Sequence, residues 1–370
     1  MNVSRRQLLQ GIAASAAVAA ADKTSAFAAD SMNSGPANSL PWPQPLGSRV
    51  TESLRPIIEN SRDVRTHYEK IVEVAGWMAY EELPMPNLAV PYGLEKTPDI
   101  AIDFVMVGNT VDTAFTNFQT HVKFQTDYAN AHFSDSEAMF ACLKRAMDGG
   151  IPILDGKFLA RITRRDMDRI FAGNMEIPML EEKMGLFRQA GDVLAAKYGG
   201  RYYNFIRSCP PRLYDNGKGL VERLAMEFPR YNDVSIYDGH EVKFYKLAQL
   251  GFWQIYSGLG TAGGFRLEDP QKMTAFADYI VPVALRLMGV TSYSPLLERT
   301  INTYQLIPRD SHQEIEIRAH CLYATALLAD EINKLRPPDQ QVIIPQIDAR
   351  LWTHYHTTPW PHHLTRTIMY

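Results

Sequence analysis

The sequence is poor in cysteine and lacks the short motifs that identify common cofactor sites. Its three cysteines, Cys142, Cys209 and Cys321, stand far apart and form no CxxC pair. A zinc site or redox pair built on adjacent cysteines is therefore not predicted, and an odd count argues against a disulfide-stapled scaffold. Neither a GxGxxG pattern nor a P-loop is present, so we expect no dinucleotide fold and no cofactor.

The chain also lacks a large excess of charge of either sign. Lysine and arginine number 38 and aspartate and glutamate 41, which gives a net charge of −3 and a pI of about 6.4. Nothing in this balance predicts the large basic face that binds intact nucleic acid. The 46% hydrophobic and 21% charged residues are typical of an ordinary globular protein. We see no repeat of about 20–50 residues, which argues against a solenoid or propeller.

The N-terminus carries the order of features found in secretory signals. The Arg5-Arg6 pair precedes an apolar run, Gly11–Ala21, and Ala26–Ala28 offers a small-residue cleavage site. The run is shorter than the ~20 residues that a membrane span requires. The arginine pair fits the twin-arginine export machinery, so we predict a signal peptide over residues 1–28 and a periplasmic or exported protein. The alternatives are a disordered alanine-rich tail, or a cytoplasmic protein whose start codon is placed too far upstream.

Helical patterns dominate the remainder of the chain. Residues 29–49 are rich in serine, proline and asparagine without periodicity, which predicts a flexible linker. After them, apolar residues recur at spacings of three and four, and two segments, Ile100–Val107 and Gln341–Ile347, fit strands. We therefore expect one mainly α domain over residues 50–370 with a few short strands; two lobes with a cleft between them are the alternative. The predicted helices are Thr51–Met78, Ala138–Met147, Arg164–Phe171, Leu180–Lys197, Gly219–Glu227, Val242–Tyr256, Pro270–Asp278, Pro282–Met288 and Glu314–Leu335.

One carboxylate, Asp278, stands inside the apolar segment FADYIVPVALRLMG, Phe276–Gly289. A charge that leaves water is costly unless it is paired or its pKa shifts. Pro282 cannot lie inside a helix, so the chain must kink or restart close to Asp278. Two interpretations fit equally well at this point: Asp278 is directed into a pocket, or it caps the helix that begins at Pro282.

Lys246 lies on an apolar and aromatic stripe of the predicted helix Val242–Tyr256. Val242, Leu250 and Trp253 are its neighbours along the helix face. A lysine in such a place more often packs its stem and holds its amine in water than forms part of a site. The pattern alone therefore favours a snorkelling lysine.

Glu314 and Arg318 lie four residues apart on one helical face. Pairs of this kind are usually exposed and stabilise a helix by only a few tenths of a kcal/mol. A solvated face is thus the expectation here.

The C-terminal tail contains four of the ten histidines, His354, His356, His362 and His363. Their HYH and HH spacing matches none of the usual zinc patterns, and no HExxH accompanies them, so we predict no metal site. A histidine and arginine lining for an anionic group fits better, because Arg366 presents a fork suited to phosphate. An ordinary surface tail is the alternative.

Five short words of sequence follow one another along the chain: DGGIPILDGKFLARIT (Asp148–Thr163), FYKLAQ (Phe244–Gln249), MTAFADYIVPVALRLMG (Met273–Gly289), EIEIRA (Glu314–Ala319) and HHLTRTIMY (His362–Tyr370). Each word is weak alone, but five in register are specific. In these words and their order, the chain resembles the queuosine salvage proteins, the queuosine 5′-phosphate N-glycosylase/hydrolases, from Ile57 to its last residue.

The resemblance implies a compact helical fold similar to helix-hairpin-helix DNA glycosylases. It implies a small-molecule nucleotide substrate, queuosine 5′-phosphate, whose bond between ribose and queuine is hydrolysed to recover the base for tRNA. The acid of the FADY word is catalytic in the family and corresponds to Asp278. The FYK lysine corresponds to Lys246, and the acid shortly before the LW pair corresponds to Asp348.

The remaining site residues are expected to bind the substrate. We expect Lys246, His363 and Arg366 at the phosphate or ribose end. Aromatic side chains are expected to stack on the base; these are Phe276, Tyr279, Trp253 and Phe118.

The chain departs from the family pattern on the side expected to bind the base. Members of the family usually have the motif KRAQ, followed by an aspartate one or two helical turns later. In this chain Leu247 occupies the arginine position, and the aspartate position falls on or near Gln254. The early NFxFW-like word appears only as FTNF, Phe115–Phe118. These departures and the predicted signal leave a second hypothesis open, a periplasmic binding protein for a nucleoside or deazapurine without catalysis.

Overall fold

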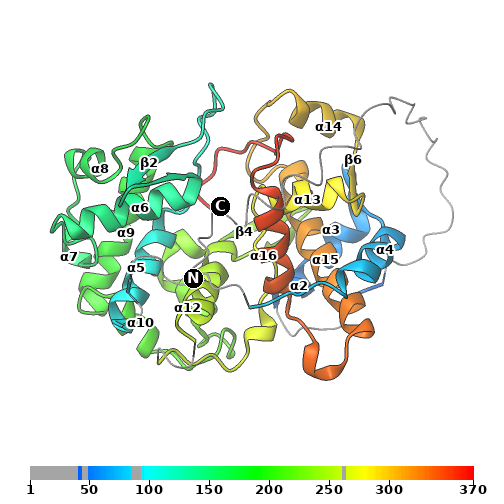
Figure 1. Ribbon diagram of the computed structural model, residues 1–370, viewed down its shortest axis with the longest axis horizontal. Helices are drawn as coiled ribbons and strands as arrows, with labels where there is room; N and C mark the ends of the chain where they lie inside the picture. Colours follow the sequence, from blue (N-terminus) through cyan, green and yellow to red (C-terminus); the bar gives the residue numbers. More distant parts are fainter. Residues whose placement is uncertain (1–40, 44–48, 86–92, 95, 261–263) are drawn as a thin grey trace, which may run out of the picture. The chain divides into compact units, whose positions relative to one another are not determined.

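The computed structural model describes residues 41–43, 49–85, 93–94, 96–260 and 264–370 (Figure 1). The predicted signal peptide, residues 1–28, lies outside them, and so does most of the predicted linker. Arg49, the last residue of that linker, already begins a helix. The described residues form one compact unit.

The expectation of a mainly α fold is confirmed, and the resemblance to helix-hairpin-helix glycosylases remains a prediction. Six of the predicted helices appear with closely matching bounds, as α6, α8, α9, α11, α13 and α15. The helices are α2 (Arg49–Ser53), α3 (Arg55–Asn60), α4 (Tyr68–Met78), α5 (Pro98–Val111), α6 (Asp135–Asp148), α7 (Gly156–Leu159), α8 (Arg164–Ile170), α9 (Leu180–Lys197), α10 (Tyr202–Arg207), α11 (Leu220–Glu227), α12 (Lys246–Leu259), α13 (Val281–Leu287), α14 (Pro295–Asn302), α15 (His312–Leu335) and α16 (Ile344–Tyr355).

Short antiparallel strand pairs join these helices. β1 (Val64–Thr66) pairs with β6 (Thr291–Tyr293), β2 (Gln125–Tyr128) with β3 (Ala131–Ser134), and β4 (Val234–Tyr237) with β5 (His240–Lys243). Three short 3₁₀ segments, Pro229–Tyr231, Pro270–Lys272 and Pro338–Gln340, complete the described elements. Because each pair has only two strands, the hydrophobic core is built by the helices.

Helix α5 is the central helix of the part that also contains α6, α9, α10 and α12 (Figure 1). Every residue from Ala101 to Val111 is buried, so the helix has no polar face. The predicted strand Ile100–Val107 is therefore wrong, because an apolar run buried on all sides shows no helical period to distinguish it from a strand. Pro98 occupies the first helical turn, where a missing N–H has no cost.

Helix α15 is the second helix that is buried on nearly all sides. It packs against α3, α4, α13 and α16, and every residue from Glu314 to Ala329 is buried. The predicted solvated face at Glu314 and Arg318 is consequently wrong. Both charged side chains point into protein rather than water.

Three predicted segments differ from the observed elements for local reasons. Gln341–Ile347 is not a strand, because Pro345 lies in the first turn of α16 and Gln346 Oε1 accepts from Ile343 N at 2.9 Å. Thr51–Met78 is divided into α2, α3, β1 and α4, since β1 leaves the helical path to pair with β6. Residues 242–245 precede α12, and Val242 lies in β5 instead of the predicted helix.

The fourth difference concerns the segment that carries Asp278. The predicted helix Pro270–Asp278 is limited to the 3₁₀ turn Pro270–Lys272, and residues 273–278 have no regular structure. Asp269, which precedes this turn, makes no cap hydrogen bond and accepts instead from Leu213 N at 2.7 Å. Asp278 thus lies in an irregular segment directly before α13.

Candidate active site

Residues 273–278 are held in place by buried side chains from three helices. Gln249 of α12 accepts a hydrogen bond from Thr274 N at 3.0 Å. Asp348 of α16 accepts from Phe276 N at 2.8 Å, and Arg318 of α15 donates from Nε to Ala277 O at 3.3 Å. These contacts replace the backbone hydrogen bonds that a helix would have supplied, and they fix the backbone immediately before Asp278.

Asp278 is 9% exposed and uses one carboxylate oxygen to bind the start of α13. Oδ1 accepts from Ile280 N at 2.8 Å and from Val281 N at 3.0 Å. Within the part of the chain that the structure describes, no hydrogen bond reaches Oδ2. The two interpretations left open by the sequence are therefore compatible, because one oxygen caps the helix while the other remains available.

Lys246 is the first residue of α12 and lies beside the acids. Its side chain is 8% exposed, and Nζ is 3.9 Å from Asp112 Oδ2. Its backbone N donates to Asp233 Oδ2 at 3.2 Å. The snorkelling interpretation is therefore wrong, because the amine is buried near carboxylates instead of reaching water.

The two predicted acids and Lys246 lie within electrostatic reach of one another. Burial raises the pKa of Asp278, while the charge of Lys246 opposes this rise. Burial also raises the pKa of Asp348 well above its ordinary value, and the negative charge of Asp278 adds to that rise. Asp348 is therefore harder to ionise than an exposed aspartate, whereas at Asp278 the positive charge of Lys246 is the largest influence that opposes burial. This leaves Asp278 as the better candidate for a carboxylate that is ionised during the reaction.

The predicted aromatic residues are divided between the core and the site. Trp253 is fully buried and Phe276 nearly so. Tyr279 stacks on His362 with ring centroids 4.4 Å apart. Burial raises the pKa of Tyr279 well above its ordinary value, and the charges of Asp135, Asp278 and Asp112 add to the rise. Tyr279 thus lies within electrostatic reach of Asp278 and Asp112.

Of the three residues expected at the phosphate or ribose end, Lys246 lies beside the acids, whereas His363 and Arg366 do not join this group. His363 is buried with Nε2 3.3 Å from the Tyr370 hydroxyl, and burial lowers its pKa to about 3. It is therefore neutral at physiological pH and offers no cation to a phosphate. Arg366 is 56% exposed, pairs with Glu182, and lies over the half-buried ring of Phe118.

Sequence reasoning missed a buried ion pair behind the site. Arg318 binds Asp233 through two parallel hydrogen bonds of 2.9 and 2.6 Å, a geometry specific to the guanidinium fork. Its guanidinium lies between the rings of Phe244 and Tyr370, at 3.9 and 4.4 Å from their centroids. Because Asp233 also accepts from Lys246 N, this pair connects α15 to the start of α12.

Asp112 was also missed, because a single acid at the end of an apolar run has no pattern of its own. It follows the last residue of α5 and is 5% exposed. No group of three His, Cys, Asp or Glu suited to a metal occurs in the described residues.

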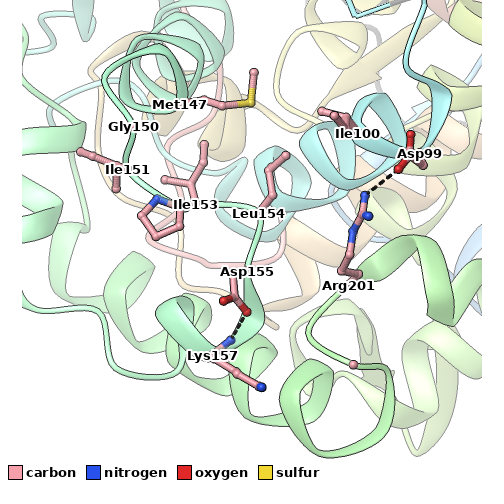
Figure 2. Close-up of a pocket in the computed structure, with 12 residues that line it drawn as sticks. Asp99, Ile100, Met147, Gly150, Ile151, Ile153, Leu154, Asp155, Lys157 and Arg201 are labelled. Atoms are coloured by element: carbon pink, nitrogen blue, oxygen red, sulfur yellow. Dashed lines mark hydrogen bonds and ion pairs between the residues drawn. The ribbon is translucent and has the colours of Figure 1, made fainter.

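A separate pocket of about 600 Å³ lies at the opposite, N-terminal end of α5 (Figure 2). It is lined by the loop after α6, by the first residues of α5 and by Arg201, which pairs with Asp99 at 3.2 Å. None of the predicted site residues lines it. The acids around Lys246 therefore remain the candidate active site.

The chain is similar to known proteins of one family. Residues 93–370 match the family described as queuosine salvage protein. The chain is 30% identical to a queuosine 5′-phosphate N-glycosylase/hydrolase of Sphaerobacter thermophilus over 325 residues, 87% of this chain and 97% of that protein. Proteins of the same name from Bos taurus and Schizosaccharomyces pombe are 27% and 28% identical, and each match covers 82% of this chain and 90% of the relative.

Proposed function

Because the chain belongs to the queuosine salvage protein family, we propose that it hydrolyses the N-glycosidic bond of queuosine 5′-phosphate and releases queuine. The observation that supports this most is the state of Asp278. Its backbone is held by contacts from three helices, one oxygen is bound by two N–H groups, and the other has no hydrogen bond among the described residues.

The reaction requires such a carboxylate. As the bond from C1′ to the base breaks, positive charge develops on the sugar, and an ionised acid close to C1′ stabilises it. The same carboxylate orients the water that attacks C1′ and accepts a proton from it, while the departing base takes up a proton. Queuine is a 7-deazapurine without an N7 to protonate, so Asp278 must supply much of the transition-state stabilisation.

Lys246 and Asp348 support this role in different ways. The ammonium of Lys246 lowers the pKa of Asp278 against the effect of burial, which favours the reactive, ionised form. Asp348 holds Phe276 N and thereby fixes the backbone two residues before Asp278. The relatives that this chain matches over most of its length are named N-glycosylase/hydrolases, so the binding-only hypothesis is not favoured.

The test is direct detection of the product. Incubation of the purified protein with synthetic queuosine 5′-phosphate is expected to yield queuine and ribose 5-phosphate, measured by mass spectrometry. Isothermal titration with queuine and with queuosine 5′-phosphate is run beside it. Tight binding of either compound without any product would contradict hydrolysis and support the binding protein.

We also propose that residues 1–28 direct export through the twin-arginine machinery, on the support of the Arg5-Arg6 pair and the apolar run Gly11–Ala21. No helix of the described residues is long and apolar enough to cross a membrane. N-terminal sequencing of the protein recovered from the periplasmic fraction is expected to begin just after Ala28. Recovery in the cytoplasm with Met1 or an internal methionine at its start would contradict export.

A further inference from the structure

We propose that Asp112 is a substrate-binding residue of this site and that its carboxylate accepts a hydrogen bond from the 2′-hydroxyl of the nucleotide's ribose. The inference deepens the proposed function and rests on it. It concerns a residue that the sequence patterns did not identify. Four observations carry it: burial, lack of a hydrogen bond, a fixed backbone and closeness to Asp278.

The carboxylate of Asp112 is buried but not hydrogen-bonded. Its side chain is 7% exposed, and its contact with Lys246 Nζ is a 3.9 Å ion pair, longer than a hydrogen bond. Among the described residues, no donor reaches either oxygen. Other buried acids differ: Asp233 accepts from Arg318 and from Lys246 N, and Asp103 accepts from Arg201 and Tyr203 N. A buried charge without hydrogen bonds is unfavourable, and donors on a ligand would satisfy it.

Two buried cations stand close to Asp112 but bind backbone carbonyls instead of its carboxylate. Arg230 donates from Nε to Thr110 O at 2.8 Å and from Nη2 to Asp112 O at 3.4 Å. Lys183 donates to Thr113 O and, at 2.9 Å, to Pro178 O. These bonds satisfy carbonyls at the C-terminal end of α5. They hold the backbone around Asp112 rigid while they leave its carboxylate available.

The position of Asp112 is unfavourable for helix stability. The C-terminal end of a helix carries partial negative charge, and an anion there is destabilising. Asp112 directly follows Val111, the last residue of α5. A buried acid that neither caps the helix nor forms a hydrogen bond contributes little to stability, which points to a role in binding.

The closeness of Asp112 to Asp278 identifies the part of the nucleotide that Asp112 binds. Asp112 Oδ2 lies 3.9 Å from Nζ of Lys246, the residue whose positive charge also acts on Asp278, so Lys246 places Asp112 in the same part of the site as the acid that must face C1′. In agreement, the charge of Asp112 raises the pKa of Asp278. The ribose hydroxyls adjoin C1′ and are donors, whereas the phosphate is an anion that Asp112 repels. In glycosidases, hydrogen bonds to the 2-hydroxyl strengthen in the transition state, and Asp112 is placed to make this contact.

The experiment compares queuosine 5′-phosphate with its 2′-deoxy counterpart in wild type and in Asp112→Asn. The substitution keeps the shape but removes the charge, so a charge-assisted hydrogen bond becomes a neutral one. We expect kcat/KM for the ribonucleotide to fall about 10- to 100-fold, with a much smaller change for the 2′-deoxynucleotide. The preference for the ribonucleotide over the deoxynucleotide should therefore shrink by a similar factor.

Asp99→Asn is the matched control. Asp99 lies on the same helix, is half-buried and pairs with Arg201 away from the acids, so its replacement should leave both rates within about twofold. An Asp112→Asn protein whose ratio between the two nucleotides equals that of wild type would overturn the proposal. If wild type releases queuine from neither nucleotide, the proposed function itself is wrong.

A second measurement applies if Asp112→Asn does not fold. Asp278→Asn retains Asp112, and titration calorimetry with this variant compares the binding of the two nucleotides without turnover. The 2′-deoxynucleotide is expected to bind about tenfold more weakly, the value of one charge-assisted hydrogen bond. Equal affinities would overturn the assignment of Asp112 to the 2′-hydroxyl.

Discussion

Replacing Asp278 with asparagine is expected to lower the turnover of queuosine 5′-phosphate by about a thousandfold or more while the fold remains intact. The loss is large because the substitution removes the charge that stabilises the developing sugar cation. The fold is retained because asparagine Oδ1 can still accept from Ile280 N and Val281 N, the two bonds that Asp278 Oδ1 makes. The measurement is queuine release by mass spectrometry, with circular dichroism and thermal unfolding as the check on folding.

The control for this variant is Asp168→Asn. Asp168 is an exposed acid of α8 that pairs with Arg164, and its replacement should leave turnover unchanged. Turnover of Asp278→Asn within about tenfold of wild type would remove Asp278 from the mechanism, because a positioned acid or base contributes at least about a hundredfold.

The pH dependence of wild-type activity provides a second test of the role of the Asp278 carboxylate. Burial raises the pKa of Asp278 above its ordinary value of 3.8, and the reactive form is ionised. Activity should therefore fall on acidification through a pH above that ordinary value. Because Asp278 and Asp348 interact, the apparent pKa on the acidic side of the profile of kcat/KM against pH reports on both carboxyl groups together. Lys246→Met removes the opposing positive charge and should raise this apparent pKa; an unchanged apparent pKa would contradict the coupling.

The second large effect is expected on stability. Arg318→Ala should reduce the free energy of unfolding by about 3–5 kcal/mol, because it leaves Asp233 buried without its partner. The substitution also removes the guanidinium that lies between the rings of Phe244 and Tyr370. The measurement is urea unfolding at equilibrium, followed by fluorescence and by circular dichroism so that two-state behaviour is checked.

The control and a double-mutant cycle make this prediction specific. Arg299→Ala on α14 removes an exposed arginine and should change stability by no more than about 0.5 kcal/mol. Asp233→Ala, alone and combined with Arg318→Ala, measures the coupling between the two side chains. A loss below about 1 kcal/mol for Arg318→Ala would match an exposed pair and contradict the burial of this one.

The β4–β5 hairpin before α12 shows a turn that the sequence interpretation missed. Asp238-Gly239 joins β4 to β5, and both residues have positive φ, 47° and 84°. This Asp-Gly turn is a strong hairpin signal, yet the apolar residues after it were assigned to a helix from Val242. The Asp-Gly turn was outweighed by the helical spacing of the apolar residues in α12. The hairpin could therefore have been predicted from the sequence.

The burial of α5 and α15 is a different case, because no local pattern contained it. A helical period reports one apolar face against one polar face, and both helices are surrounded by others. For α5 the consequence was a false strand. For α15 it was a false solvated face, because Glu314 and Arg318 have the spacing of a surface pair and differ only in what packs over them.

By itself, the sequence determined that the protein is mainly helical, which family it belongs to, and that Asp278, Lys246 and Asp348 are the residues to consider together. Helix periodicity indicates the fold class, and the five ordered words indicate the family and the three residues. Both can be read from residues that are neighbours in the sequence. Only the tertiary structure decided which charges are buried and paired. Asp233 and Arg318 are 85 positions apart, Asp112 and Lys246 come from different helix ends, and His363 is neutral because of what surrounds it. Solvation and charge pairing depend on segments brought together by folding, so they cannot be inferred from the order of residues along one segment.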